Sequence, residues 1–363
     1  MLEDARKNID AIDREMAELF AKRMESAREI AQYKKERGLS VEDSFREQQI
    51  VERASQMIEN TQIRKYYIDF LNFTMSLSKR YQQSLMNGIK VAYCGVEGAF
   101  AHIAAMNLFP EGTAVSYPSF NAAYKAVEDS QCDLCVLPIE NSFAGDVGSV
   151  MDLIFSGSLH INRIYNLGIT QSLLAKKGTK IDDIKRVISH PQALEQCAEY
   201  IERHNFRTIE YTNTALSAVE VRDSADSDIA CIASEDAAKL YDLDVLEVGI
   251  NSRKNNTTRF AVFSKVQEKP DKANRMGGHF ILVFTVKNEA GALANALNII
   301  GVHGFNICNL TSRPMKSLMW NYYFFMELEG NINTPDGEDM MNELSHICDR
   351  LRLAGVYTKE PEL

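Results

Sequence analysis

Proline is absent from the first 88 residues, and glycine occurs there only at Gly38 and Gly88. All eight prolines of the chain come later, the first being Pro110. Because proline and glycine interrupt helices, this segment is predicted to be helical. Its apolar residues recur at spacings of three, four and seven, as on one face of a helix. That face carries Ile9, Ile12, Met16, Leu19, Phe20, Ala27 and Ile30.

Other features that the sequence lacks narrow the class of protein. It has no run of about 18 apolar residues, so we expect no membrane-spanning helix, and its charged start lacks the apolar stretch of a secretion signal. The net charge of -10 offers no basic surface for nucleic acid. Seven scattered cysteines are typical of reduced thiols rather than of a disulfide framework. We therefore expect a cytoplasmic protein with no nucleic-acid and no membrane partner.

Three helices are predicted in residues 1–88, over about residues 1–37, 45–60 and 63–86. Asp43 or Ser44 lies near the start of the second helix, and Gly38 is a candidate C-cap of the first. A helix of about 37 residues with few local partners cannot bury its apolar face alone. We therefore expect this domain to form an intertwined dimer.

From residue 89 short apolar runs alternate with helical stretches. This alternation predicts an α/β domain over residues 89–265, with one or two mostly parallel sheets. Its length suits two lobes with a cleft, where ligands bind in such folds. The predicted strands are residues 89–93, 114–117, 134–139, 187–189, 229–233 and 260–264, and helices are expected over 120–129 and 192–204.

The last part of the chain follows a segment interpreted as a linker, residues 265–278, which contains Pro270 and two glycines. Residues 279–363 then have the order strand, helix, strand, strand, helix, strand, which is the βαββαβ pattern. The expected fold class is therefore multi-domain, with an all-α three-helix domain, a two-lobed α/β domain and a βαββαβ domain.

The helical segment carries cations spaced for one small anion. Arg23 and Lys34 are eleven residues apart, which places them about 20° apart on one helix face, and Arg46 follows in the next helix. Arg6 precedes Arg23 by seventeen residues, lies about 100° away and does not share that face. The alternative interpretation is a solvated charged face without a ligand.

Six motifs in this segment resemble the all-helical chorismate mutase family over about 80 residues. They are Ala5–Asp13, Ala21–Arg23, Tyr33–Lys34, Asp43–Glu47, Ser78 and Gln82. The resemblance implies catalytic roles for Lys34, Gln82 and Glu47. It implies substrate-binding roles for Arg6 (from the partner chain), Arg23, Arg46, Asp43 and Ser78.

The chemistry of chorismate mutase fits such a set of residues. The rearrangement of chorismate to prephenate is unimolecular and needs no nucleophile or proton shuttle. The protein must hold the reactive conformer and stabilise the negative charge that grows on the ether oxygen. Gln82 donates at any pH because a carboxamide does not titrate. We therefore expect a mutase rate that is nearly flat above neutral pH.

Four motifs follow in the α/β region, and each alone is compatible with a helix cap or a turn. They are Gly95–Phe100, Pro138–Ser142, Ser189–Leu194 and Thr257–Phe260. In this order they resemble the prephenate dehydratase family over about residues 90–264. The resemblance implies a two-lobed fold similar to periplasmic binding proteins. It also implies a reaction in which prephenate loses carbon dioxide and its C4 hydroxyl.

The same resemblance implies that Thr258 is the catalytic residue that assists departure of the hydroxyl. It implies that the cleft is lined by Glu140, Asn141, Ser189, Gln192 and Arg259. Ala99 and Ala101 stand where the family has Thr and Ser, so only backbone donors are expected in the first loop. His190, between a strand end and a proline, is interpreted as structural.

Cys132 and Cys135 have the spacing of a redox or metal pair. There is no second pair and no nearby histidine, and both residues adjoin a predicted strand. We therefore interpret them as small residues of the core and expect no metal.

The C-terminal segment contains Gly291–Leu293 before a helix, Thr311–Pro314 at the end of a strand, and Trp320 and Phe325 downstream. These residues resemble the ACT regulatory domain of prephenate dehydratases. The resemblance implies an effector site for phenylalanine formed by Gly291, Ala292, Leu293, Ser312 and Arg313. Thr311 replaces the glutamate of the family, which bears on how tightly phenylalanine binds. The alternative is a vestigial or purely oligomerising domain.

These expectations describe a bifunctional enzyme of phenylalanine biosynthesis without a cofactor. It converts chorismate to prephenate and prephenate to phenylpyruvate, and phenylalanine inhibits it. Two alternatives stay open: a ligand sensor whose helical domain only dimerises, and a dehydratase that acts on arogenate. The expected assembly is a homodimer or homotetramer.

Overall fold

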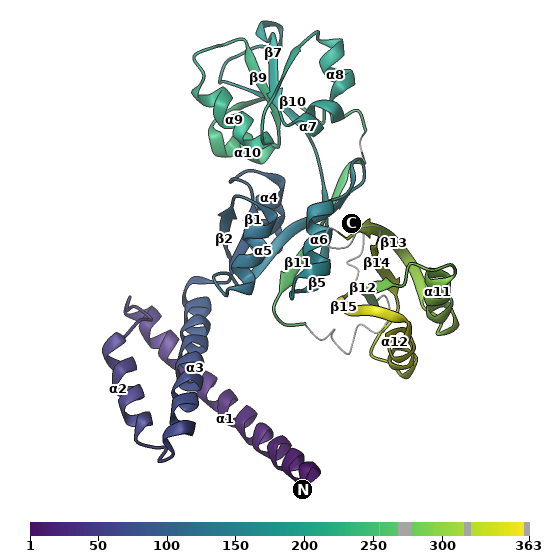
Figure 1. Ribbon diagram of the computed structural model, residues 1–363. Helices are drawn as coiled ribbons and strands as arrows, with labels where there is room; N and C mark the ends of the chain where they lie inside the picture. The colour runs from purple at the N-terminus through teal and green to yellow at the C-terminus, as the bar shows by residue number, and fades with distance from the viewer. Residues whose placement is uncertain (254, 268–277, 316–320, 359–363) are drawn as a thin grey trace. The chain divides into compact units, whose positions relative to one another are not determined.

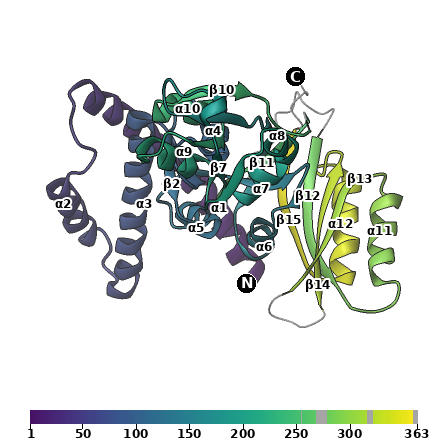
Figure 2. The same cartoon turned by 90° about the horizontal axis from the view of Figure 1, so that it is seen from above.

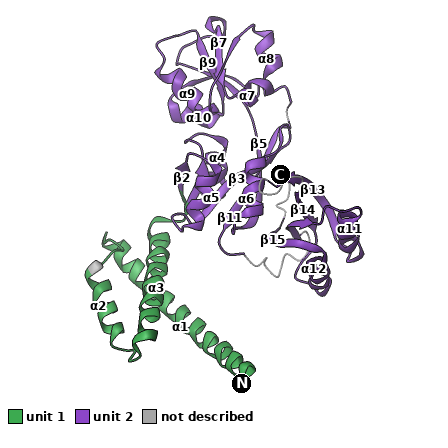
Figure 3. Cartoon of the chain, in the orientation of Figure 1, with its two compact units in different colours: residues 1–90, 111–113 green, residues 91–110, 114–363 purple. Residues whose placement is uncertain are grey.

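The structure is a computed structural model that describes residues 1–253, 255–267, 278–315 and 321–358 (Figure 1). The chain divides into two compact units (Figure 3). The first comprises Met1–Lys90 with Glu111–Thr113, and the second comprises Val91–Pro110 with Ala114–Leu363. Among the described residues, no helix combines the length and the apolar character needed to cross a membrane.

Three helices build the first unit: α1 (Leu2–Glu36), α2 (Ser44–Ser55) and α3 (Thr61–Asn87). Asp43 caps α2 by accepting a hydrogen bond from the Arg46 N–H. Asn60 caps α3 in the same way, and α2 ends at Ser55, about five residues earlier than predicted. The three predicted helices are otherwise confirmed, although Arg37 is the C-cap of α1 and Gly38, with φ +62°, follows it.

The apolar face of α1 is not covered by the other two helices of its unit. Only Ala27 and Ala31 of this helix are buried. Ile9 is 57% exposed and Leu19 is 64% exposed, although both belong to the apolar face. Leaving such a side chain in water forfeits about 1.5–3 kcal/mol relative to its burial. The helical unit therefore leaves an apolar surface on α1 in contact with solvent.

The second unit contains two sheets. The first has ten strands in the order β13-β14-β12-β15-β5-β11-β3-β1-β2, with β4 paired to β3. Its strands in the α/β region are β1 (Lys90–Cys94), β2 (Thr113–Tyr117), β3 (Leu134–Asn141), β4 (Gly145–Asp146), β5 (His160–Gly168) and β11 (Thr257–Ser264). The helices of this lobe are α4 (Phe100–Leu108), α5 (Phe120–Glu128) and α6 (Gly148–Ser156).

The second sheet has the order β10-β6-β9-β7-β8. Its strands are β6 (Ser172–Ala175), β7 (Arg186–Ser189), β8 (Arg207–Glu210), β9 (Ile229–Ala233) and β10 (Asp244–Val248). Its helices are α7 (Pro191–Gln196), α8 (Ala198–Arg203), α9 (Thr214–Asp223) and α10 (Glu235–Tyr241), with a short 3-10 turn at Ile181–Asp183. The single helix predicted over 192–204 is thus divided at Cys197.

The two-lobed α/β organisation is confirmed, but the prediction of mostly parallel strands is wrong for several strands. β11 runs antiparallel to both β3 and β5, and β6 runs antiparallel to β9 and β10. The reason is the path of the chain. It leaves the first sheet through β5 and returns through β11, and these two neighbours must therefore point in opposite directions.

The C-terminal part follows the predicted order. Its elements are β12 (Gly278–Val286), α11 (Ala292–Val302), β13 (Asn306–Pro314), β14 (Tyr322–Glu329), α12 (Pro335–Ile347) and β15 (Cys348–Thr358). Helices α11 and α12 pack side by side against these strands (Figure 2). The second helix was predicted to extend to residue 351, but the chain becomes strand at Cys348. Most of the predicted linker, and Trp320, lie outside the described residues.

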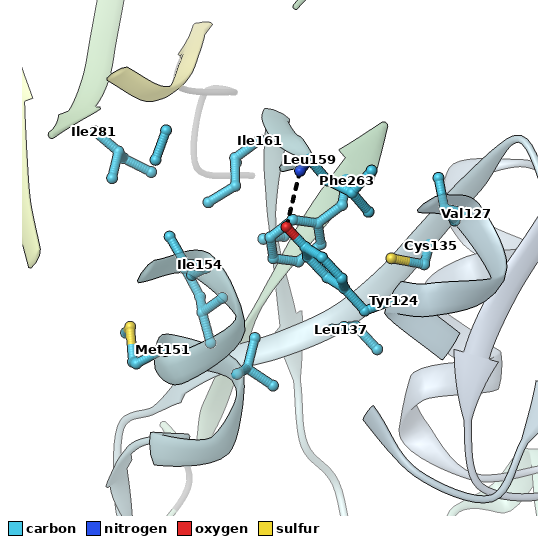
Figure 4. Packing of buried hydrophobic residues seen from close by; sticks show 14 of the residues in the cluster. Tyr124, Val127, Cys135, Leu137, Met151, Ile154, Leu159, Ile161, Phe263 and Ile281 are labelled. Atoms are coloured by element: carbon cyan, nitrogen blue, oxygen red, sulfur yellow. Dashed lines mark hydrogen bonds between the residues drawn. The ribbon is translucent and has the colours of Figure 1, made fainter. Parts of the chain in front are cut away.

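Strand β12 of the C-terminal region is buried on both faces. Along β12, Phe280 and Leu282 pack with α11 and α12, whereas Ile281 and Val283 pack with the α/β lobe, as strand alternation requires. Figure 4 shows Ile281 within the core that also contains Ile161 and Tyr124, whose hydroxyl accepts a hydrogen bond of 2.9 Å from the Leu159 N–H. The α/β lobe and the C-terminal region therefore share one hydrophobic core.

The junction of these two regions depends on a glycine. β15 pairs with β5 at Gly355 and Ile161. A Cβ at position 355 would overlap the Ile161 carbonyl oxygen. The absence of a side chain at Gly355 therefore permits the close approach of β15 to β5. This pairing joins the C-terminal strands to the α/β strands in the first sheet.

Candidate active sites

Arg23 joins α1 to α3 in the helical unit. Its Nη1 donates to the Thr74 carbonyl oxygen at 3.3 Å and to the Ser78 hydroxyl. Burial lowers the pKa of Arg23, but a guanidinium remains charged at neutral pH. The structure thus brings Arg23 and Ser78 together, and this cation lies between helices rather than on a solvated face.

Two further predicted residues, Gln82 and Lys34, lie on the same pair of helices. Gln82 is one turn beyond Ser78 on α3 and is 8% exposed. Its Oε1 is buried and has no hydrogen-bond partner among the described residues. Lys34 Nζ donates to the Val41 carbonyl oxygen at 2.8 Å. A buried amide group left unpaired costs about 1–3 kcal/mol, so the free end of Gln82 is suited to meet a ligand.

Glu47 of α2 forms an ion pair that sequence reasoning missed. Lys79 Nζ lies 3.0 Å from both carboxylate oxygens of Glu47. Lys79 adjoins Ser78 and precedes Gln82 by three residues on α3, and this helical neighbourhood is the signal that could have identified it. Asp43 acts as the cap of α2, while the Arg46 side chain is exposed.

Arg6 does not meet the other predicted residues within one chain. It lies on the same continuous helix as Arg23, seventeen residues earlier. At 1.5 Å per residue this is about 25 Å along the helix axis. No side chain spans that distance, so Arg6 cannot complete the pocket of its own chain.

In the second unit, Asn141 is the centre of a buried hydrogen-bond network. Its Nδ2 donates to Thr258 Oγ1 and to Asn256 Oδ1, each at 2.9 Å. Its Oδ1 accepts from the N–H groups of Phe143 and Ala144, each at 3.0 Å. Register between β3 and β11 places Asn141 opposite Thr258. The predicted neighbours Asn141 and Thr258 are therefore in direct contact, and Asn256 is an additional member that sequence reasoning missed.

Arg259 lies next to Thr258 on β11 and binds two carboxylates. Its Nη1 is 2.9 Å from Glu140 Oε2, and its Nη2 is 2.9 Å from Glu327 Oε1 on β14. The Tyr357 hydroxyl donates to Glu327 as well. Burial alone would lower the pKa of Arg259, but Glu327 and Glu140 more than offset it, so the pKa is raised. A residue of the predicted cleft is thus tied to the C-terminal sheet.

The remaining predicted cleft residues, Ser189 and Gln192, belong to the second sheet. Ser189 ends β7, is fully buried, and its hydroxyl donates to the Ile232 carbonyl oxygen at 2.6 Å. Gln192 is half-buried in the first turn of α7. No hydrogen bond among the described residues joins either one to Asn141 or Thr258. His190 caps α7, and its Nδ1 accepts from the Gln192 N–H at 3.3 Å, which fits the structural role predicted for it.

The first loop, Gly95–Ala99, is held by two residues of the second lobe. The Tyr241 hydroxyl donates to the Glu97 carbonyl oxygen at 2.6 Å, and Ser234 Oγ donates to that of Gly98 at 3.2 Å. Ala99 is the N-cap of α4 and makes no side-chain hydrogen bond.

A cavity of about 290 Å³ lies beside the Asn141 network. Its lining includes Ser142, Phe143, Gln196, Asn251, Arg253 and Asn256. The predicted cleft residues do not line it directly. Asn256 and Phe143 belong both to the lining of this cavity and to the hydrogen-bond network of Asn141, and Asn256 takes part in that network through its side chain.

Cys132 and Cys135 are core residues. They are 4% and 0% exposed and pack in the cluster around Tyr124. Burial raises the pKa of the Cys135 thiol well above its usual value, which disfavours the thiolate that redox or metal chemistry needs. Within the described ranges, no group of three or more His, Cys, Asp or Glu side chains could hold a metal ion.

The predicted effector residues occupy two elements of the C-terminal region. Gly291 adopts φ +85° and begins α11, where Ala292 and Leu293 follow. Arg313 Nε lies 3.3 Å from Asp152 of α6, and Thr311 Oγ1 donates to Asp146 of β4 at 3.0 Å. Ser312 between them is exposed. Alternate residues of β13 thus face the α/β lobe, whereas Ser312 points the other way.

An arginine held between two helices and a buried threonine in an α/β lobe fit a multi-domain enzyme that acts on small carboxylates. Family models agree. The model for chorismate mutase type II matches residues 5–83, and that for prephenate dehydratase matches residues 91–268.

Individual relatives cover nearly the whole chain. The bifunctional chorismate mutase/prephenate dehydratase of Aquifex aeolicus is 30% identical, over 99% of this chain and 98% of the relative. The Arabidopsis thaliana arogenate dehydratase/prephenate dehydratase 2 is 32% identical, over 77% of this chain and 76% of its own length. The crystal structure of Arthrobacter aurescens prephenate dehydratase in complex with L-Phe matches with a TM-score of 0.69 and 26% identity, covering 76% of this chain and 92% of that one.

The chain therefore belongs to the bifunctional chorismate mutase/prephenate dehydratase family, whose members serve phenylalanine biosynthesis. The match over residues 5–83 identifies the helical unit as a chorismate mutase domain rather than an inert dimerisation segment.

Proposed function

We propose that chorismate is rearranged in the helical unit, in a pocket built around Arg23. The observation that carries this proposal is the contact of Arg23 with Ser78, one turn from a buried Gln82 oxygen that has no partner among the described residues. The substrate carboxylates bind Arg23, Arg46 and Arg6 of the partner subunit.

Lys34 and Gln82 donate to the ether oxygen of chorismate. The two ends of a carboxamide have the same shape, and Gln82 can therefore turn its NH₂ group toward that oxygen. Glu47 accepts from the ring hydroxyl, and Asp43 and Ser78 complete the pocket. The two fixed donors stabilise charge that develops only in the transition state.

The helical unit acts as a homodimer in this proposal, alone or within a homotetramer. Support comes from the exposed face of α1, on which Ile9, Ile12 and Leu19 are each more than half exposed. A second copy would cover this face and would also bring its Arg6 to the pocket that the first copy cannot complete.

Prephenate is then dehydrated at Thr258. Asn141 donates to Thr258 Oγ1, so the hydroxyl hydrogen of Thr258 is directed elsewhere, toward the C4 hydroxyl of the substrate. Glu140, Asn141, Ser189, Gln192 and Arg259 surround the substrate when the two lobes bind it. Aromatisation of the ring drives the loss of carbon dioxide, so the main task of the enzyme is to assist the leaving hydroxide.

We further assign residues 1–88 to the mutase domain, 89–265 to the dehydratase domain and 279–363 to an ACT domain that binds phenylalanine. The βαββαβ order supports the last assignment. Gly291, Ala292, Leu293, Ser312 and Arg313 would form the effector site. Because Arg313 and Thr311 contact Asp152 and Asp146 of the α/β lobe, an effector that moves β13 would disturb the dehydratase domain. The odd number and scattered positions of the seven cysteines support a cytoplasmic location.

Arogenate is a second candidate substrate for the dehydratase. It carries an ammonium group where prephenate has a ketone. Glu195 and Glu199 line the cavity beside Asn256, and carboxylates there would attract an ammonium group.

The test is to supply chorismate to the purified chain and follow phenylpyruvate, with and without phenylalanine. We expect phenylpyruvate to form and phenylalanine to suppress it, and Arg313→Ala to weaken the suppression. Formation of prephenate without phenylpyruvate would contradict the dehydratase assignment. A higher kcat/KM for arogenate than for prephenate would favour the second candidate.

A further inference from the structure

The side chain of Asn256 has a fixed orientation, set by a chain of hydrogen bonds. Asn141 Oδ1 accepts from two backbone N–H groups, so its NH₂ group must be the end that faces Asn256 and Thr258. Asn256 therefore presents its oxygen to Asn141, which donates to it at 2.9 Å. The NH₂ group of Asn256 must then point away from Asn141.

That NH₂ group is a buried donor without a partner. Asn256 is 6% exposed, and its Nδ2 makes no hydrogen bond to any residue that the structure describes. Its backbone oxygen already anchors the segment by accepting from the Ile169 N–H at 2.8 Å, so the side chain is not needed for that purpose. A buried unpaired donor costs about 1–3 kcal/mol, and Asn256 also lines the cavity of about 290 Å³.

The Thr258 hydroxyl is oriented by the same Asn141 side chain. Its Oγ1 accepts from the same Asn141 nitrogen at 2.9 Å, and it donates to no other described residue. Two neutral donors, the Thr258 hydroxyl and the Asn256 amide, are thus held by one amide group and both are free to meet an oxygen.

We propose that Asn256 is a second catalytic donor of the dehydratase and that, with Thr258, it binds the hydroxide that leaves C4 of prephenate. This inference rests on the proposed role of Thr258. In the reaction, the bond from C1 to its carboxylate breaks and its electron pair enters the ring, while the C4–O bond breaks and its pair leaves with the oxygen. Prephenate dianion gives phenylpyruvate anion, carbon dioxide and hydroxide, so atoms and charge balance.

Two donors remove the need for a strong acid. A threonine hydroxyl is too weak an acid to protonate the leaving group fully. A pair of neutral donors instead stabilises the developing negative charge on oxygen, as an oxyanion hole does, and the hydroxide takes its proton from solvent afterwards. Neutral donors also avoid a fixed negative charge that would repel the substrate dianion.

The test compares Asn256→Ala with Asn256→Asp in the full-length enzyme, using prephenate as substrate. The alanine variant loses the donor, and we expect kcat to fall about 10²-fold with KM changed less than about threefold. The aspartate variant keeps an oxygen for Asn141 but has a donor only when its carboxyl is protonated. Its kcat relative to wild type should therefore rise as pH falls, by about tenfold per pH unit above the carboxyl pKa.

A residue that only supports the fold would not produce that pH signature. The mutase rate of each variant normalises the enzyme concentration, and thermal unfolding reports whether the second unit is folded. An alanine variant with wild-type kcat, or an aspartate variant with a pH-independent ratio, would overturn the inference. If instead wild-type enzyme fails to dehydrate prephenate, or Thr258→Ala retains full activity while Asn256→Ala does not, the proposed function or the role of Thr258 is at fault.

Discussion

The two candidate sites of this protein differ in how much of each is built by one chain. In the helical unit, Arg23 and Ser78 meet, but Arg6 lies about 25 Å away along α1 and the apolar face of that helix is exposed. In the α/β lobe, Asn141, Asn256 and Thr258 are each at least nine-tenths buried, and Asn141 donates a hydrogen bond to each of the other two. The proposed mutase pocket is therefore incomplete within one chain, whereas the donors of the proposed dehydratase site are placed by folding alone.

Breaking the assembly is expected to have the largest effect. Ile9→Arg combined with Met16→Arg places two charges on the apolar face of α1. We expect a monomer whose mutase rate is lower by at least about 10³-fold, because the pocket loses Arg6 of the partner subunit. Dehydratase activity should stay within about twofold, since its donors lie in one chain. Light scattering and the two activity assays measure this.

The matched control is Glu18→Arg, which reverses a charge on the opposite side of α1. This variant should remain an oligomer with normal mutase activity. A monomeric double variant that retains full mutase activity would contradict the difference between the two sites.

The reciprocal experiment removes the Thr258 hydroxyl from the dehydratase site. Thr258→Ala should lower the dehydratase kcat by about 10²–10³-fold and leave the mutase rate unchanged. The neighbouring Thr257→Ala should change neither activity by more than about threefold, because its side chain makes no hydrogen bond among the described residues. Equal losses from both substitutions would contradict the assignment of Thr258.

A smaller effect is expected where the C-terminal sheet meets the dehydratase lobe. Glu327→Gln removes a carboxylate whose side chain is 7% exposed and which pairs with Arg259. We expect the free energy of unfolding of the second unit to fall by about 3 kcal/mol, since a buried cation loses part of its compensation.

Glu140 provides the comparison for that measurement. It pairs with the same Arg259, but its side chain is 32% exposed, and Glu140→Gln should cost only about 1 kcal/mol because solvent screens this pair. Urea unfolding of both variants gives the two values. A larger loss for Glu140→Gln would show that Glu327 is not the principal anchor of Arg259.

The smallest change is expected in the pH profile of the wild-type mutase. Arg23 stays charged and Gln82 does not titrate, so the rate should vary by less than about twofold from pH 7 to 9. Gln82→Glu sharpens the contrast, because a glutamate donates only when protonated, and its rate should fall about tenfold per pH unit above the carboxyl pKa. A steep fall of the wild-type rate between pH 7 and 8 would contradict the role of Gln82.

Local patterns predicted much of the fold. The helical period and the lack of proline placed α1, α2 and α3, and the order of elements in the C-terminal region was correct. Strand direction was less predictable. The sequence of β11 does not reveal that it lies beside β5 and returns antiparallel, because that depends on the path through the second lobe.

The residues of the candidate dehydratase site were also predicted only in part from the sequence. Motif order pointed to Asn141, Thr258 and Arg259, and the structure joins the first two directly. Asn256 was missed, although it lies two residues before Thr258, because an asparagine in a polar loop has no distinguishing pattern. Glu327 was missed because it lies 68 residues beyond Arg259 in another region of the chain.

The sequence by itself determined which segments are helix or strand, which residue types are available for chemistry, and that α1 carries a continuous apolar face. These are properties of local spacing and of side-chain chemistry. The tertiary structure alone decided which polar groups share a hydrogen bond, which donors are left free, and that β12 is buried on both faces between α/β lobe and helices. The reason is that these pairings join segments that are far apart in the sequence. A shift of one residue in the register of two strands moves each side chain to the opposite face.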